Sequence, residues 1–480
     1  MRTAGTQIFC AATPSAVVVM AAAVEAGLLP DAGRRMLLVC DDAPVPEAAP
    51  PWDEVPGFAR LRARFDAVLS WNEAIRPFHP AAWTPRTEDV PLLERHVRRL
   101  WALGDDRVEL VLGAPDAPPA QAVARVFTGA PLHVCAGGPA DYGPTRGKLD
   151  PLIGTRVRQV LHLDLVPGLT PLLLSEFGAP ARAVPAEAFR AVAGEIASAV
   201  KGVPEGAALV AGQCLSALGI TDPGGEDALH AEMVRAAAGR GHRHVVFAPH
   251  PASPVRHGSA PRAEAERLGV DLTVLDTPVP AEALYEACRP ALVVGCSSTA
   301  LFTASALYGL PVARVGTERL LERLTPYHHP HRVALVLAEA VLPGAESGEG
   351  PALPEAGTVP GAGSGGEVAR VEGGDTPPVP RGGGDAPAGP RPAAGNGAAG
   401  DGLRGLLSTL AFTVRPQVHP SLRAVAERYL AAGAWDRRWF PRRRLTALGL
   451  PGGVPRQVVF LSRSRIARRM VRRVRTAVRG

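Results

Sequence analysis

Two segments of the sequence carry polar side chains directly after apolar runs. Residues 245–248 lead into His250, which stands between two prolines, and residues 291–295 lead into Cys296-Ser297-Ser298-Thr299. Short apolar runs bounded by glycine or proline predict buried strands, so the polar residues are expected where each strand ends. An imidazole can donate a proton and hydroxyl groups can bind a phosphate. Together the segments predict a phosphate-binding site at the carboxyl edge of a parallel sheet.

The hydroxyl cluster also precedes a predicted helix. Leu301, Ala304, Ser305 and Tyr308 recur with the spacing of one helical face. The cluster 297–299 therefore lies near the first helical turn, where unpaired backbone N–H groups and the positive end of the helix dipole favour an anion. Each motif alone has a plainer interpretation, as a helix N-cap or as a rigid turn. Their occurrence in consecutive strand–helix units favours a site.

Two similar halves are expected to position these residues. In residues 1–185 and again in 186–342, short apolar runs alternate with helical patterns, which predicts βαβ units and parallel sheets. The fold class is therefore α/β, with two Rossmann-like domains. Strands of the first half are expected at Gln7–Ala11, Met36–Cys40, Ala67–Leu69, Glu109–Leu112, Leu132–Cys135 and Gln159–Leu163. Those of the second are expected at Ala208–Gly212, Val245–Ala248, Leu272–Leu275, Ala291–Val294 and Val312–Val315.

Composition divides the rest of the chain. Residues 343–402 are mostly Gly, Pro and Ala, and they hold too few large apolar side chains to offset their conformational entropy, so a disordered insertion is expected. Residues 403–417 are expected to complete the second domain. Within 418–450, Val418–Phe440 is predicted to form one helix that crosses back to the first domain. Residues 451–480 form an Arg-rich tail.

Overall composition sets the class of protein. A chain of 480 residues with 46% hydrophobic content can build two or more packed domains. The net charge of +6 is uneven: residues 434–480 hold 14 Arg and one Asp, a balance of +13, which leaves about −7 for the first 433. Six scattered cysteines without C-x-x-C spacing indicate a reducing compartment. Because no apolar run reaches about 18 residues, no transmembrane helix is expected, and the protein is predicted to be cytoplasmic.

The basic tail suggests a class of partner. Apart from Phe460, the nearby aromatic residues, Trp435, Trp439 and Phe440, precede the tail instead of interleaving with its arginines, so nucleic acid is not an expected partner. An anionic membrane surface fits better, since polybasic segments bind it with about 1 kcal/mol per charge. A solvated tail without a partner is the alternative. The cluster 328–331, His-His-Pro-His, matches no standard zinc spacing, so no metal site is expected.

His250-Pro251 and Ser297-Ser298 resemble the His-Pro and Ser-Ser motifs of bacterial sialyltransferases. The chain as a whole resembles the bacterial α-2,8-polysialyltransferase family, over roughly 1–342 and 403–450. Further segments that carry the resemblance are 163–169, 211–219 and 309–316. It implies a GT-B fold and inverting transfer of sialic acid, or a related nonulosonic acid, from a CMP-sugar to a glycan acceptor, which is often lipid-linked. No metal or other cofactor is implied.

The resemblance also implies roles for individual residues. His250 is expected to donate a hydrogen bond or a proton to the departing phosphate. The donor is expected to contact Pro251, Gln213, Ser216, Ser297, Ser298 and Thr299.

The acceptor hydroxyl needs a base, and here the sequence departs from the family pattern. The family has an acidic residue directly before a glycine in a loop of the first domain. The matching loop is 135–146, and aligning its Gly138 places Gly137 at the acidic position. Glycine cannot accept a proton. Asp141 is the candidate substitute, with a turn-forming role as the alternative. A second departure is Ala248, where a basic residue is expected.

Three functions remain open at this stage. The first is an active CMP-sugar-dependent glycosyltransferase. The second is a degenerate member that binds nucleotide or glycan without transfer, and the third is a nucleotide-sugar hydrolase or epimerase on the same fold. Acceptor identity, linkage and polymer formation do not follow from the sequence.

Overall fold

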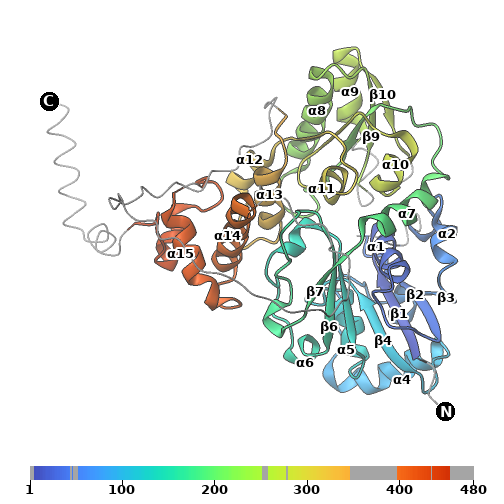
Figure 1. Ribbon diagram of the computed structural model, residues 1–480. Helices are drawn as coiled ribbons and strands as arrows, with labels where there is room; N and C mark the ends of the chain where they lie inside the picture. Colours follow the sequence, from blue (N-terminus) through green and yellow to red (C-terminus); the bar gives the residue numbers. More distant parts are fainter. Residues whose placement is uncertain are drawn as a thin grey trace, which may run out of the picture.

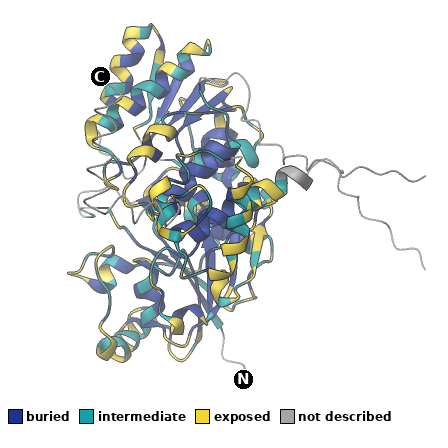
Figure 2. Cartoon of the chain, turned by 90° about the vertical axis from the view of Figure 1, so that its left-hand side faces the viewer, coloured by how far each residue is buried: buried dark blue, intermediate teal, exposed yellow. Residues whose placement is uncertain are grey.

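The computed structural model describes residues 5–43, 46, 52–250, 258–276, 279–345, 397–433 and 435–454. They form two α/β domains, with the second above the first in Figure 1, and each is built around a parallel sheet. The central strands of both sheets are buried, whereas most of the edge strands are more exposed (Figure 2). Two Rossmann-like domains of this kind make up the GT-B arrangement, so the predicted fold class is confirmed.

The first domain contains a seven-stranded sheet with the order β3-β2-β1-β4-β5-β6-β7. All six predicted strands are present. The seventh, β7, escaped prediction because this edge strand exposes Arg182 and Ala183 and so shows no apolar run. The strands are β1 (Gly5–Ala11), β2 (Arg34–Val39), β3 (Ala67–Ser70), β4 (Arg107–Leu112), β5 (Leu132–Ala136), β6 (Val157–Leu163) and β7 (Ala181–Val184).

The second domain contains a five-stranded sheet with the order β10-β9-β8-β11-β12. All five predicted strands are present. They are β8 (Ala208–Ala211), β9 (His244–Ala248), β10 (Asp271–Val274), β11 (Leu292–Gly295) and β12 (Val312–Arg314). The direction of strand progression reverses between β8 and β11, which is where such sheets bind ligands.

Helices connect the strands. Those of the first domain are α1 (Pro14–Glu25), α2 (Phe58–Arg62), α3 (Trp71–Ile75), α4 (Val90–Leu100), α5 (Ala120–Val126) and α6 (Pro151–Gly154). Those that follow are α7 (Ala186–Ala197), α8 (Pro223–Gly239), α9 (Ser259–Leu268), α10 (Ala281–Cys288), α11 (Thr299–Ala306), α12 (Thr317–Arg323) and α13 (His331–Val341).

Helix α7 joins the two domains. It packs against α1 of the first domain and α10 of the second (Figure 1). Arg64 binds Glu195 of α7 through two hydrogen bonds of 2.8 and 2.7 Å and also contacts Glu25 of α1 at 3.0 Å. A bidentate arginine–carboxylate pair fixes orientation as well as distance, so α7 is held firmly on the first domain.

The C-terminal part corrects two predictions. The single helix Val418–Phe440 is wrong: a 3-10 turn at Pro420–Leu422 precedes α15 (Arg423–Ala431), and Gly433, at φ 75°, follows its end. Proline and left-handed glycine interrupt a pattern that is otherwise helical. The expected insertion is also too long at both ends. Pro343 and Ala345 hydrogen-bond to Arg314 of β12, and α14 (Gly397–Val414) begins before residue 403. Residues 346–396 and 455–480 lie outside the described part.

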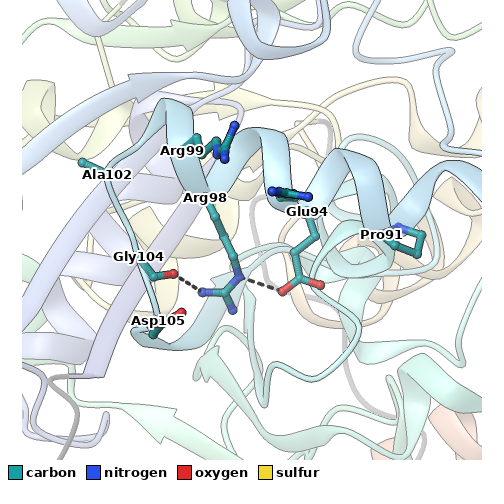
Figure 3. Close-up of a pocket in the computed structure, with 8 residues that line it drawn as sticks. Pro91, Glu94, Arg98, Arg99, Ala102, Gly104 and Asp105 are labelled. Carbon is teal, nitrogen blue, oxygen red and sulfur yellow. Dashed lines mark hydrogen bonds and ion pairs between the residues drawn. The ribbon is translucent and has the colours of Figure 1, made fainter.

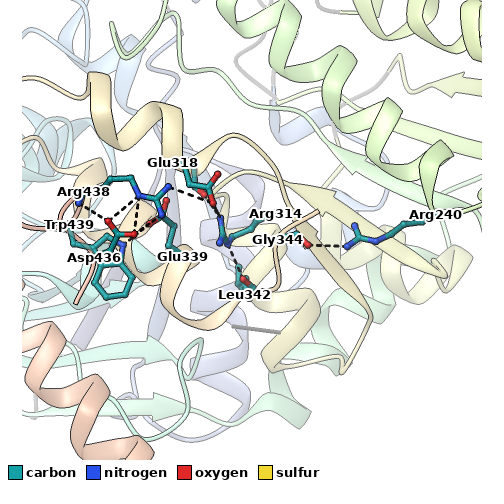
Figure 4. Close-up of polar contacts among 10 residues, drawn as sticks. Arg240, Arg314, Glu318, Glu339, Leu342, Gly344, Asp436, Arg438 and Trp439 are labelled. Atoms are coloured by element: carbon teal, nitrogen blue, oxygen red, sulfur yellow. Dashed lines mark hydrogen bonds and ion pairs between the residues drawn. The ribbon is translucent and has the colours of Figure 1, made fainter. Parts of the chain in front are cut away.

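Polar contacts tie the C-terminal segment to the second domain (Figure 4). Arg438 forms ion pairs with Asp436 and, in α12, with Glu318. Trp439 Nε1 donates a 2.6 Å hydrogen bond to Glu339 of α13. From α14, Arg404 reaches the carbonyl of Gly168 in the first domain at 3.3 Å. The C-terminal helices therefore contact both domains.

The bond between Trp439 and Glu339 gives a stability prediction. Glu339 is 4% exposed, its pKa is raised by burial, and its Oε1 atom has no hydrogen-bond partner among the described residues. Trp439→Phe removes the one donor to Oε2 that the structure shows, and we expect a loss of about 1–3 kcal/mol in the free energy of unfolding. Chemical denaturation measures it.

Glu339→Gln is the matched control. It removes the buried charge while keeping an acceptor for Trp439, so its cost should be smaller. A Trp439→Phe variant as stable as the wild type would show that the bond does not contribute.

Candidate active site

The sheet of the second domain brings three loops to one edge. Because β8 lies between β9 and β11, the loop that contains Gln213 is flanked by His250 after β9 and by Ser297 after β11. All three strands run parallel, so their carboxyl ends meet at this edge. The sequence motifs thus lie side by side, at the reversal point where a ligand is expected.

The start of α11 has no side-chain cap. Ser298 occupies the N-cap position in an extended conformation, but its hydroxyl makes no capping hydrogen bond. Its Oγ is buried and has no partner among the described residues. Ser297 is buried, and Thr299 is half-buried. The N-cap interpretation is therefore wrong for the hydroxyl of Ser298, and the first N–H groups of α11 remain suited to an anion.

His250 lies at an exposed position two residues beyond β9. Although its accessible area is large, desolvation by surrounding protein atoms lowers its pKa below the usual 6.5, and the charge of Glu226 opposes this in part. The free protein therefore holds a mainly neutral imidazole at neutral pH. Pro251 lies outside the described residues.

Gln213 and Ser216 make hydrogen bonds within the protein. The backbone N–H of Gln213 donates to Nε2 of His230 at 2.9 Å, and its side-chain amide donates to the carbonyls of 211 and 212. The hydroxyl of Ser216 donates to Glu226 at 2.5 Å. These contacts shape the loop after β8. Glu226 and His230 are fully buried, and sequence reasoning missed them, although they are polar residues four apart on one face of α8.

In the first domain, Asp141 uses both carboxylate oxygens. Oδ2 accepts a 3.0 Å hydrogen bond from the N–H of Gly138, and Oδ1 forms an ion pair with Arg146. Both contacts lie in the 3-10 turn after β5, Pro139–Tyr142, and its flanks. The turn-forming interpretation of Asp141 therefore holds, and a proton acceptor would have to work against these two contacts.

Two of three glycines in this loop, Gly138 and Gly143, bring it against the second domain, whereas Gly137 faces α1 of the first domain. Among the described residues, a Cβ added at Gly137 would meet only Val19, at 3.4 Å, and its backbone is not in the left-handed region, so a Cβ is tolerated there. A Cβ at Gly138 would lie 3.3 Å from Oγ1 of Thr299. A Cβ at Gly143 would lie 2.7 Å from Val333 of α13. The loop of the first domain thus touches the start of α11 directly.

The histidine cluster lies at the start of α13. Burial, together with the charges of His329 and Arg146, lowers the pKa of His331 to about 4. The backbone N–H of His331 donates to the His329 ring at 3.3 Å. Within the described ranges, no group of three or more His, Cys, Asp or Glu side chains is placed to hold a metal ion.

Two cavities lie elsewhere. One of about 510 Å³ borders α4, where Arg98 bonds to Glu94 and to the carbonyl of Gly104 (Figure 3). The other, of about 850 Å³, lies between α15 and the segment after α16 (Arg442–Leu448). Neither is lined by the residues that the sequence motifs single out.

Comparison with known proteins gives one match to a family model. The model described as alpha-2,8-polysialyltransferase (POLYST) matches residues 7–317. No curated protein matches the sequence.

Solved structures show only distant likeness. The GT-B domain of a sialyltransferase from Photobacterium damselae has 12% identity and a TM-score of 0.34, covering 69% of this chain and 95% of that one. UDP-GlcNAc 2-epimerase from Methanocaldococcus jannaschii has 9% identity, a TM-score of 0.39 and coverages of 71% and 89%. Acinetobacter baumannii MurG has 11% identity, a TM-score of 0.37 and coverages of 71% and 85%. At such TM-scores these likenesses carry no argument about function.

Gly143 and Gly137, both in the loop after β5, give a paired prediction about stability. Gly143→Ala places a methyl group against Val333 and should cost about 1–3 kcal/mol of unfolding free energy, the usual range for overpacking. Gly137→Ala should be nearly neutral, because its Cβ meets only one atom at contact distance. Thermal or chemical unfolding of both variants measures this. Equal stability of the two would contradict the close approach of loop and α13.

Proposed function

We propose, given that the chain belongs to the alpha-2,8-polysialyltransferase family, that it transfers sialic acid or a related nonulosonic acid from a CMP-sugar to a glycan acceptor. Glycosyl transfer follows from the family. The CMP donor, inversion at the anomeric carbon and independence of metal are our proposals. The observation that supports the charged donor is the contact between the loop of the first domain and the uncapped start of α11, because it brings an acceptor side and an anion-binding side together.

On the donor side, the phosphate of CMP is placed at the first turn of α11. Ser297, Ser298 and Thr299 supply hydroxyl groups there, and the helix supplies N–H groups. His250 lies at the neighbouring strand end and gives a hydrogen bond or a proton to the phosphate as the glycosidic bond breaks. Gln213 and Ser216 support this edge through their contacts with α8.

On the acceptor side, a base is needed to take the proton of the attacking hydroxyl. Asp141 is the nearest carboxyl group in the matching loop, and Gly137 stands where the family carries an acid. The contacts of Asp141 with Gly138 and Arg146 favour a second candidate function, a member that binds nucleotide or glycan without transferring sugar.

One incubation separates the two functions. CMP release is measured after mixing the protein with CMP-sialic acid and a panel of glycan acceptors. Acceptor-dependent release supports transfer. Thermal stabilisation by CMP without release supports the binding function, and release without acceptor would indicate a hydrolase.

The setting in the cell is also proposed. No helix in the described part of the chain is long and apolar enough to cross a bilayer. The six cysteines are buried and none forms a disulfide bond, which supports a reducing compartment. We place the protein in the cytoplasm, with its Arg-rich tail at the anionic inner face of the membrane, where a lipid-linked acceptor would be found.

His250→Ala is expected to lower the rate of CMP release by about 100-fold or more, since general acids contribute about 10²–10⁴-fold. The melting temperature should hardly change, because the side chain is exposed. If His250 transfers a proton, kcat/KM of the wild type for the donor should fall as pH rises through a midpoint below 6.5, because only the protonated imidazolium can act as the acid. An equally fast variant with the same pH profile would remove His250 from the mechanism.

Gly137→Glu is expected to raise the transfer rate. The wild type should be slow, since no acid stands at residue 137, and a Cβ at this position would lie at ordinary contact distance from Val19. Rates of CMP release for the wild type and the variant test this.

Asp141→Asn is the control. Complete loss of activity would identify Asp141 as the base, whereas partial loss fits a role in holding the loop. A fast wild type that is indifferent to both substitutions would place the base elsewhere.

A further inference from the structure

A chain of polar contacts links three segments at the carboxyl edge of the first sheet. Oδ2 of Asp116, in the loop after β4, accepts hydrogen bonds from the backbone N–H groups of Arg146 at 2.7 Å and Gly147 at 2.9 Å. Nη2 of Arg146 pairs with Asp141, and Asp141 accepts from Gly138 at 3.0 Å. Asp116 thus fixes the backbone of Arg146, and the side chain of Arg146 fixes the turn that contains Asp141.

The chain of contacts ends at the second domain. The point where a Cβ of Gly138 would lie is 3.3 Å from Oγ1 of Thr299 and 3.6 Å from Oδ2 of Asp141. The carboxyl group of Asp141 and the first-turn hydroxyl of α11 therefore flank the same glycine. Because Asp141 accepts a hydrogen bond from Gly138, a shift of Asp141 is expected to move Gly138, which lies beside the proposed phosphate site.

The ion pair between Asp141 and Arg146 is partly shielded from water. The side chains are 15% and 31% exposed, respectively, so solvent screens their attraction less than that of a surface pair. The structure shows one guanidinium nitrogen, Nη2, in this contact, and Nε is buried without a hydrogen-bond partner among the described residues. One positively charged nitrogen is therefore enough for the contact with Asp141, and the two-pronged geometry of a guanidinium group is not required.

We propose that Arg146 is a positioning residue. Through Asp141 it holds the Gly137–Gly138 turn against the first turn of α11, in the arrangement in which donor and acceptor meet. This inference rests on the proposed function and deepens it. Arg146 acts through Asp141 and not on the substrate, so its loss should disturb the alignment of the acceptor while leaving the donor-binding edge intact.

Arg146→Met tests the inference. Without the positive charge, Asp141 loses one of its two contacts and the N–H of Gly138 loses a fixed acceptor. We expect kcat for CMP release to fall by about 10–100-fold, since misplacement by about 1 Å can cost 10²-fold. The dissociation constant for CMP should stay within about twofold of the wild type, because α11 and His250 are unchanged. Should Arg146→Met not fold, Arg146→Gln, which is also uncharged, takes its place.

Arg146→Lys is the conservative variant. An ammonium group can replace the single Nη2 contact, so at least tenfold of the lost rate should return. Arg95→Met, on the exposed face of α4, is the matched control for removing an arginine and should behave as the wild type.

Amide hydrogen exchange of the unliganded protein gives a readout that does not depend on activity. Residues 137–142 should exchange faster in Arg146→Met than in the wild type, and Arg146→Lys should restore protection. If the wild type transfers no sugar, the proposed function fails while this exchange still tests the positioning role.

Three results would overturn the inference. The first is unchanged exchange together with unchanged turnover in Arg146→Met. The second is a Lys variant as impaired as Met, which would indicate contact of the guanidinium with substrate. The third is an equal loss of CMP binding, which would place Arg146 in the donor site.

Discussion

The arrangement of the molecule depends on one close approach between its two domains. The loop after β5 touches the start of α11 at Gly138 and the first turns of α13 at Gly143, and each glycine leaves too little room for an unstrained larger side chain. Glycine at these positions lets backbone and side chain come within contact distance across the domain boundary. Tyr142, between them, anchors the same loop by donating to the carbonyl of Leu163 and accepting from the N–H of Leu165.

The parallel strands of the two sheets determine which residues lie near this contact between the domains. The strands of each sheet run parallel, so polar residues that follow different strands collect at one edge of each sheet. In the second domain the order of strands places the loop after β8 between His250 and Ser297. The buried Glu226 and His230 of α8 bind that loop through hydrogen bonds. Among the described residues, no side chain caps the first N–H groups of α11, which can therefore bind an anion.

The positions of the strands could be predicted from the sequence, but the contacts between the loops that follow them could not. Apolar runs bounded by glycine and proline identified eleven of the twelve strands in the described part of the chain, since burial on both faces leaves a clear signal. Strand β7 was missed because Arg182 and Ala183 are exposed at the edge of the sheet. The prediction of one helix over Val418–Phe440 was wrong because the apolar periodicity does not reveal where Pro420 and Gly433 interrupt the helix.

At the candidate site, the motifs predicted the position of Ser298 but not the state of its hydroxyl, which does not cap the helix. The pairing of Asp141 with Arg146 depends on how the four residues between them fold back, and no periodicity in the sequence encodes that. The interior roles of Gln213 and Ser216 likewise became visible only with their partners on α8.

The central claim is that a nucleotide phosphate binds where the first-domain loop meets α11. Amide hydrogen exchange of the wild type with and without saturating CMP tests it most directly. The account predicts slower exchange on CMP binding in residues 296–302 at the start of α11, accompanied by slower exchange in 137–142 of the first domain. Protection confined to the cavity beside α4, or to the segment around α15 and α16, with no change at either of these places, would contradict it.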